Sequence, residues 1–173
     1  MKIGVLSDTH DRVANTRNAL VGLKQHGAEL LIHCGDICGP EIVSVFEGWP
    51  VQFVFGNNDG QWERVGNGQY RRDFSKLIRE MEAIGATWQH PFGHTELAGK
   101  KIGWTHGDNF GLLADLERSG AYDYVFCGHT HVADSYVNGS TRVINPGALH
   151  RARPKTCIVL DLDNGAVETI VVE

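Results

Sequence analysis

The sequence predicts an α/β fold made of two packed sheets with helices on their outer faces. In the first half of the chain, apolar runs of strand length alternate with helical patterns, which is typical of parallel strands joined through helices. In the second half, apolar runs follow one another through tight turns, which is typical of antiparallel strands. We therefore expect both sheets to be mixed, partly parallel and partly antiparallel.

Length and composition narrow the class of protein. The chain has 173 residues, so we expect one domain over residues 1–173, without a linker or an internal repeat. The content of 42% hydrophobic and 21% charged residues argues against intrinsic disorder. No stretch approaches the roughly 20 apolar residues that span a membrane. A net charge of −5 argues against an extended nucleic-acid surface.

Seven apolar runs have the length of strands. We interpret the first as a strand, because it is too short for the apolar core of a signal peptide and lacks a cleavage site. The runs span residues 2–7, 29–34, 51–55, 101–106, 122–127, 142–145 and 156–162.

Three segments show helical patterns: residues 13–25, 71–84 and 110–119. Asn109 is a suitable N-cap for the third, because its side chain can accept a hydrogen bond from the first turn. The apolar side of the second comprises Phe74, Leu77, Ile78, Met81 and Ile84.

Hairpin turns are predicted in residues 97–102, 137–141 and 162–167, the last two of which contain an Asn-Gly pair. Residues 56–70 form the one long segment without a regular pattern, and we expect such a loop to be functional or mobile.

The four cysteines match neither a zinc-binding pattern nor a CxxC pair. Most lie in apolar runs, so we expect buried free thiols. Free thiols fit a reducing compartment, and we therefore expect a cytoplasmic protein. The cysteines are Cys34, Cys38, Cys127 and Cys157.

Aspartate, asparagine and histidine side chains follow five of the predicted strands. The carboxyl ends of parallel strands share one edge of a sheet, where ligands bind, so we expect these residues to surround one site. They are Asp8 and His10 after the first strand, Asp36 after the second, Asn57, Asn58 and Asp59 after the third, His106 after the fourth, and His129 and His131 after the fifth.

The spacing supports a shared site. In extended backbone, residues i and i+2 point to the same side, so the Asp-x-His and His-x-His pairs each suit two ligands aimed at one locus. Four glycines flank the candidate residues and permit sharp turns and close approach of the backbone. These glycines are Gly35, Gly56, Gly107 and Gly128.

Taken singly, each motif is explained as well by a cap or a turn, but five in order at strand ends favour a metal site. Its oxygen and nitrogen ligands, without a well-placed thiolate, suit Mn²⁺, Fe, Zn²⁺ or Ni²⁺. Seven of these groups are candidate ligands, which is too many for one ion but enough for two ions that share a carboxylate. They are Asp8, His10, Asp36, Asn57, His106, His129 and His131. Two ions about 3.5–4 Å apart can hold a hydroxide between them and clamp a phosphoryl group.

These motifs together resemble the calcineurin-like metallophosphoesterase superfamily over nearly the whole chain. The short length and the INPGA segment at 144–148 resemble its small phosphodiesterase branch, which includes compact bacterial and archaeal enzymes and the small retromer subunit of eukaryotes. The motifs are Asp8-x-His10, Gly35-Asp36, Gly56-Asn57-Asn58-Asp59, His106 after a strand, and Gly128-His129-Thr130-His131.

The resemblance implies a four-layered α-β-β-α sandwich with two divalent transition-metal ions at the strand ends, for which we expect Mn²⁺ ahead of Fe, Zn²⁺ or Ni²⁺. It implies that Asp36 bridges the two ions. By the same resemblance, one ion is held by Asp8, His10 and His131, and the other by Asn57, His106 and His129. The residues expected to take part in catalysis are Asp36, Asn57, Asn58 and His106.

Residue 58 departs from the superfamily pattern. Many members have a histidine here that acts as an acid toward the leaving group, whereas this chain has Asn58. An amide does not donate a proton at useful pH, and a general acid is worth typically about 10²–10⁴ in rate. His33 and His94 are alternative proton sources, although structural or exposed roles explain them more simply.

Four residues beyond the motifs are candidates for contacts with a substrate. Arg151 and Arg153 follow the INPGA turn and suit contact with a phosphate, although a solvated role is simpler. Trp62 and Tyr70 suit stacking on a nucleobase, and core packing or a subunit contact explains them equally well.

The motifs predict hydrolysis of a small-molecule or nucleotide-type phosphodiester by a hydroxide held between two metal ions. Residues 61–74 are compatible with a homodimer or homotetramer contact, and we expect no membrane partner. The alternative is a metal-binding scaffold of the same fold with little catalysis. Because a scaffold is free to lose ligands, the complete ligand set favours the enzyme.

Overall fold

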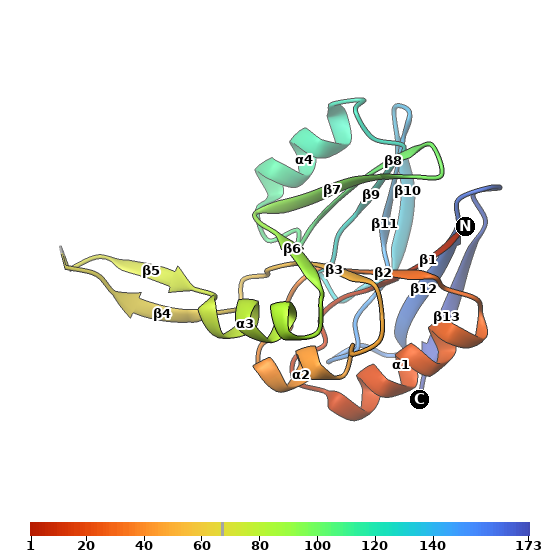
Figure 1. Ribbon diagram of the computed structural model, residues 1–173. Helices are drawn as coiled ribbons and strands as arrows, with labels where there is room; N and C mark the ends of the chain where they lie inside the picture. The colour runs from red at the N-terminus through yellow and green to blue at the C-terminus, as the bar shows by residue number, and fades with distance from the viewer. Residues whose placement is uncertain (67) are drawn as a thin grey trace.

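The computed structural model describes residues 1–66 and 68–173. They form a six-stranded sheet, a five-stranded sheet and a two-stranded hairpin (Figure 1). The helices are α1 (Val13–Gln25), α2 (Pro40–Ser44), α3 (Ser75–Ala83) and α4 (Phe110–Arg118).

The first sheet has a parallel half and an antiparallel half. β1, β2, β3 and β6 run parallel to one another, and β12 and β13 join the free edge of β1 as antiparallel strands. In spatial order the strands are β13 (Val167–Val172), β12 (Lys155–Asp161), β1 (Lys2–Leu6), β2 (Leu30–His33), β3 (Val51–Val54) and β6 (Thr87–Gln89).

The second sheet is mixed as well. β8, β9 and β11 are parallel at its centre, and an antiparallel strand closes each edge. In spatial order the strands are β10 (Asp134–Asn138), β11 (Thr141–Asn145), β9 (Tyr124–Phe126), β8 (Lys100–Thr105) and β7 (Phe92–Leu97).

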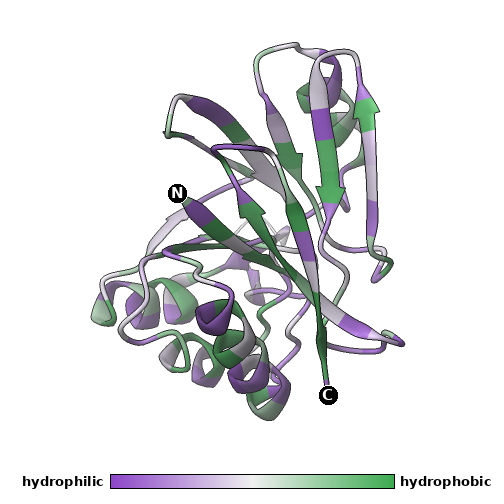
Figure 2. Cartoon of the chain, turned by 90° about the vertical axis from the view of Figure 1, so that its right-hand side faces the viewer, coloured by the Kyte–Doolittle hydropathy of each residue, from purple (hydrophilic) through white to green (hydrophobic). Residues whose placement is uncertain are grey.

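The strands alternate their side chains between two layers of core. Ile3 and Val5 of β1 pack with Trp104 of the second sheet, so this cluster lies between the sheets. Leu6 belongs to the cluster that α1, α2 and α3 form on the first sheet, and Leu116 of α4 packs on the second. The resulting order of helices, sheet, sheet and helix confirms the predicted four-layered sandwich (Figure 1). Figure 2 shows hydrophobic residues along the strands of the two inner layers.

Local predictions for the third helix and the cysteines are confirmed. The side chain of Asn109 accepts a hydrogen bond from the Leu112 N–H at 3.1 Å. All four cysteines are free, and burial raises the pKa of Cys127 and of Cys157 to about 12. No helix in the described ranges is both long enough and apolar enough to cross a bilayer.

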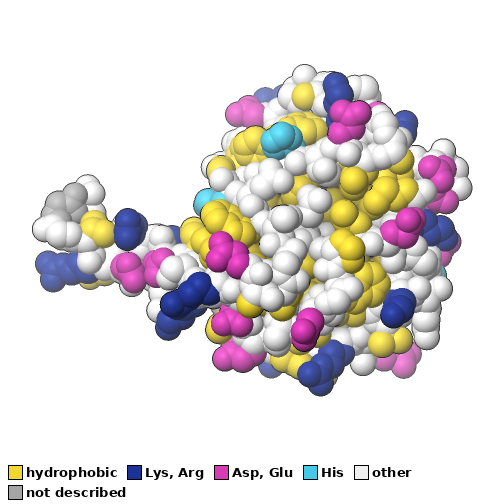
Figure 3. Space-filling view, in the orientation of Figure 1, with side chains coloured by type: hydrophobic (Ala, Val, Ile, Leu, Met, Phe, Trp, Pro, Cys, Tyr) yellow, Lys and Arg dark blue, Asp and Glu magenta, His cyan; other side chains and the backbone are white. Residues whose placement is uncertain are grey.

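The segment after β3 differs from the prediction. Residues 56–70 are not irregular throughout, because β4 (Gln61–Arg64) pairs with β5 (Tyr70–Asp73) in an antiparallel hairpin. Residue 67 lies outside the described residues. The predicted helix over 71–84 therefore begins later, at Ser75. The hairpin extends away from both sheets, and charged side chains of both signs lie along it (Figures 1 and 3).

Candidate metal centre

Loops at the carboxyl ends of β1, β2, β3, β8 and β9 bring the seven predicted ligands to one place. The ligand atoms of Asp8, Asp36 and His106 lie within 4.8 Å of one another, and so do those of Asp8, His10 and His131. The remaining two predicted ligands, Asn57 and His129, lie next to His106. Its Nε2 lies 3.1 Å from Asn57 Oδ1, and its ring centroid lies 5.1 Å from that of His129.

Asp36 lies between the two groups. Its Oδ2 is 3.3 Å from His10 Nε2 on one side and 3.4 Å from His106 Nε2 on the other. The Asn58 backbone N–H donates to Asp36 Oδ1 at 2.8 Å, and Asn58 Nδ2 donates to Oδ2 at 2.7 Å. The side chain of Asn58 thus orients the carboxylate that sits between the groups.

Asp8 belongs to both groups. Its Oδ1 lies 3.2 Å from His131 Nε2 and 3.8 Å from His10 Nε2, while its Oδ2 accepts a hydrogen bond from the His129 N–H at 3.1 Å. The carboxylate therefore links the first strand of one sheet to the loop after β9 in the other.

The backbone reaches this arrangement differently from the expected extended spacing. Asp8, His10, His129 and His131 all have left-handed φ values, between 40° and 68°. Asp8 and His10 do converge on one group, but His131 approaches Asp8 while His129 approaches His106. The i, i+2 argument was therefore right about proximity and wrong about conformation. Non-glycine residues in this region are strained, and such strain is concentrated at functional sites.

The residues present fit divalent metal ions. Asp8 Oδ1 and His10 Nε2 are buried and have no hydrogen-bond partner among the described residues. A buried polar atom without a partner costs about 1–3 kcal/mol, and a coordinated cation removes that cost. Carboxylate oxygen, amide oxygen and imidazole nitrogen together form the ligand chemistry of a transition-metal site.

A carbonyl group fixes the imidazole of His106. Its Nδ1 lies 2.8 Å from the Cys34 carbonyl oxygen, which only accepts, so Nδ1–H is the donor. Nε2 therefore faces Asp36 and Asn57, and it offers its lone pair to a cation when the ring is neutral. A backbone carbonyl that holds the second ring nitrogen is the usual partner of a metal-binding histidine.

The charges at the site support one another. Burial acts to lower the pKa of His106, but the hydrogen bond and charge of Asp36 outweigh it and raise that pKa to about 9. Burial acts in the opposite sense on Asp36, but His106 and Asn58 hold its pKa well below the ordinary value. The pKa of Asp8 is lowered too, because its contacts with His10 and the charge of His106 outweigh burial. Both carboxylates are therefore ionised and suited to bind cations.

Two glycines are required by the close approach of the loops. A Cβ on Gly56 would lie 2.3 Å from Asp36 Oδ1, and a Cβ on Gly128 would lie 1.9 Å from Ser7 Oγ. No side chain fits at these distances, so the backbone itself forms the wall behind the carboxylates.

Asp59 has a role that the sequence did not reveal. Its Oδ1 accepts hydrogen bonds from the N–H groups of Ile37 and Cys38, both at 2.7 Å. Its Oδ2 accepts from the N–H groups of Asp36 at 2.9 Å and Gly56 at 2.7 Å. Burial raises the pKa of Asp59 to about 6 against the effect of these bonds. The side chain ties the loop that carries Asp36 to the loop that carries Asn57.

Neither histidine considered as a proton source is placed for that role. His33 is fully buried against Phe46 and Phe53, and burial lowers its pKa to about 3. The Gly35 N–H donates to its Nδ1, which is a structural bond. His94 pairs with Gly103 on β8, three residues before His106 and so about 10 Å away along the strand.

His150 and Phe110 border the site and were not predicted. The ring of His150 lies 4.8 Å from that of His10 and 6.3 Å from that of His131. Arg12 Nε donates to its Nδ1 at 3.1 Å. Phe110 is 69% exposed, with its ring 6.2 Å from that of His129. These contacts join residues far apart in the chain, so no local pattern signalled them.

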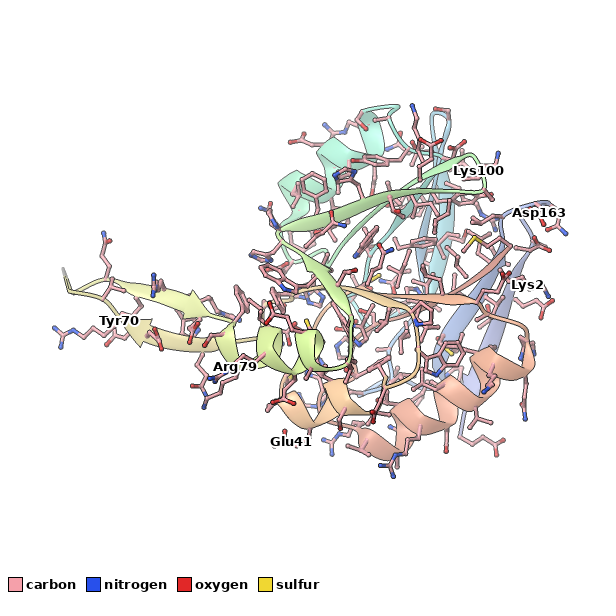
Figure 4. All side chains as sticks on the ribbon, viewed as in Figure 1. Lys2, Glu41, Tyr70, Arg79, Lys100 and Asp163 are labelled. Carbon is pink, nitrogen blue, oxygen red and sulfur yellow. The ribbon has the colours of Figure 1, made fainter. Side chains whose placement is uncertain are left out.

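The β4–β5 hairpin is attached to the site through Arg72. Its guanidinium donates to the carbonyl oxygens of Asn57 and Asp59 and lies 4.7 Å from the ring centroid of Trp62. Trp62 and Tyr70 are 63% and 65% exposed, so packing in the core does not explain them. Tyr70 lies on the β4–β5 hairpin, away from the two large sheets (Figure 4).

Comparisons with known proteins agree with this site. A family model described as the calcineurin-like phosphoesterase superfamily domain matches residues 1–165. Phosphodiesterase MJ0936 of Methanocaldococcus jannaschii is 32% identical over 177 residues, which cover all of both chains. The solved structure of a novel archaeal phosphodiesterase matches with a TM-score of 0.86 and 30% identity, over 99% of this chain and all of that one. Vacuolar protein sorting 29 from Cryptosporidium parvum shares the fold alone, with a TM-score of 0.60 and 17% identity over 98% of this chain and 95% of that one.

Proposed function

Because the chain belongs to the calcineurin-like phosphoesterase superfamily, and is therefore a hydrolase of phosphoester bonds, we propose that it cleaves small phosphodiesters with two divalent metal ions. The observation that carries the proposal is the position of Asp36 between His10 and His106, next to buried Asp8 and His10 atoms without partners. When bound, the ions supply an activated water as nucleophile and neutralise the phosphoryl oxygens.

The chain's own residues hold and orient the site. We assign Asp8, His10 and His131 to one ion, Asn57, His106 and His129 to the other, and Asp36 to both. Further hydrogen bonds hold these side chains in position before a substrate binds. Cys34 fixes the ring of His106, and Asn58 fixes Asp36. Such preorganisation spares the reaction the cost of rearranging its polar groups.

A direct assay tests the function. Protein reconstituted with Mn²⁺ is expected to hydrolyse bis-p-nitrophenyl phosphate, with Fe²⁺, Zn²⁺ and Ni²⁺ compared in parallel. The diester is expected to exceed p-nitrophenyl phosphate in kcat/KM, because the similar archaeal proteins are phosphodiesterases. Absence of metal-dependent turnover would support the scaffold alternative, and a preference for the monoester would contradict the substrate class.

Residue 58 provides a sharper test. Asn58→His is expected to raise the rate on a phenyl ester relative to the p-nitrophenyl ester of the same diester by about tenfold, since an acid helps the poorer leaving group most. Absolute rates are expected to fall, because the substitution removes the bond from Asn58 Nδ2 to Asp36. An unchanged ratio would mean that another group already supplies the proton.

We also propose that the protein is one domain that acts in the cytoplasm, with Mn²⁺ as the native ion. Four free cysteines are consistent with a reducing compartment.

A further inference from the structure

A pocket of about 400 Å³ opens beside the metal centre. One wall is the loop after β9, from Thr130 to Ala133, and it includes the candidate ligand His131. The segment after the INPGA turn, from Arg151 to Pro154, also lines the pocket. A group bound in this pocket therefore lies next to whatever occupies the metal centre.

The charge of the pocket is opposite to that of the chain. Arg151 and Arg153 line it, and no carboxylate does among the described residues around it. The chain as a whole has a net charge of −5, whereas the residues that line this pocket carry two positive charges and no negative charge. Guanidinium groups present paired donors that match the oxygens of a phosphate.

Arg12 and His150 form a hydrogen-bonded pair next to the proposed metal ligand His10. Arg12 Nε only donates, so Nδ1 of His150 accepts and the ring hydrogen of the neutral imidazole is on Nε2. The ring lies 4.8 Å from that of His10. His150 also lies 6.3 Å from the ring of His131 and directly precedes Arg151 in the chain, so it adjoins both the metal ligands and the segment that lines the pocket.

The backbone at Arg151 has a left-handed conformation. Its φ is +49°, in the region that favours glycine. Glycine would adopt this φ with less strain, so replacing Arg151 by glycine removes the side chain without straining the backbone.

We propose that this pocket binds a second phosphate of the substrate, adjacent to the phosphodiester that is cleaved. The inference rests on the proposed function and narrows its substrate to phosphodiesters that carry a neighbouring phosphate, as short oligonucleotides and phosphorylated nucleotides do. Arg151 and Arg153 are specificity-determining residues in this scheme.

The test compares two substrates with the same leaving group, p-nitrophenolate, which is measured in both assays. They are the p-nitrophenyl ester of thymidine 5′-monophosphate and its 3′-phosphorylated form. Wild-type protein with Mn²⁺ is expected to favour the second in kcat/KM by about tenfold or more. The double variant Arg151→Gly, Arg153→Ala is expected to lose this preference. Glycine suits φ +49°, so Tm should stay at or above the value for Arg153→Ala alone.

The matched control is Arg79→Ala, which removes an exposed arginine that points away from the body of the protein (Figure 4). It is expected to keep the preference of the wild type. The inference would be overturned if the ratio of kcat/KM for the two substrates were the same in the wild type and the double variant.

A binding measurement separates this inference from the proposed function. Calorimetry with Mn²⁺ compares thymidine 3′,5′-bisphosphate with thymidine 5′-monophosphate and needs no turnover. Tighter binding of the bisphosphate by wild type, lost in the double variant, supports the pocket even if no ester is hydrolysed. Equal affinity of the wild type for both ligands overturns the pocket even if bis-p-nitrophenyl phosphate is hydrolysed.

Discussion

Replacement of Asp36 by alanine is expected to lower metal-dependent hydrolysis of bis-p-nitrophenyl phosphate by about a thousandfold or more. Asp36 Oδ2 lies within 3.4 Å of Nε2 of both His10 and His106. Without it, a cation on either side loses a shared negative ligand and the two sites lose their link. Calorimetric titration with Mn²⁺ is expected to show weaker binding and fewer ions bound.

Folding must be separated from chemistry in this experiment. Asp36 has a φ of +55°, a region that asparagine tolerates better than alanine, so Asp36→Asn is the second variant. It keeps the backbone preference and removes the charge, and we expect a similar loss of activity. Asp115→Ala, on the exposed surface of α4, controls for removal of a carboxylate. Activity of either Asp36 variant within tenfold of wild type would contradict the bridging role.

The position of the site was predictable because it follows from strand direction. Parallel strands have their carboxyl ends at the same edge of the sheet, so residues that directly follow these strands lie close to one another. Asp8, Asp36 and His106 therefore meet in the structure as expected, although they are separated by up to 98 positions. The apolar runs were equally informative, because β1, β2 and β9 are buried on both faces.

The remaining features depend on contacts that leave no local pattern. β4 is exposed at all four residues, so it has no apolar face to produce an alternating signal. The bond from Arg12 to His150 spans 138 positions and joins the end of one loop to another. Asp59 resembles an ordinary turn residue, because the N–H groups that it binds at Asp36, Ile37 and Cys38 belong to a loop more than twenty positions earlier.

Asp59→Asn is expected to lower the free energy of unfolding by about 3 kcal/mol, the largest stability effect of the substitutions considered. Each oxygen of Asp59 accepts two backbone N–H bonds. Whichever way the new amide turns, its nitrogen faces two donors, and each buried N–H that loses its acceptor costs about 1–3 kcal/mol. Urea unfolding measures the change. Asp163→Asn is the control, because that exposed carboxylate pairs with the terminal amino group, and it should shift stability by at most about 0.5 kcal/mol.

The same substitution is expected to weaken metal binding, although Asp59 is not among the proposed ligands. The side chain joins the Asp36 N–H to the Gly56 N–H, and so fixes the spacing between the loops that carry Asp36 and Asn57. Groups behind metal ligands typically contribute about 10–100-fold in affinity. We therefore expect a loss of that size in Mn²⁺ titrations at a temperature where the variant is folded. Wild-type affinity in a destabilised but folded variant would show that the ligands themselves set the geometry, since the loops would then hold their spacing without the carboxylate.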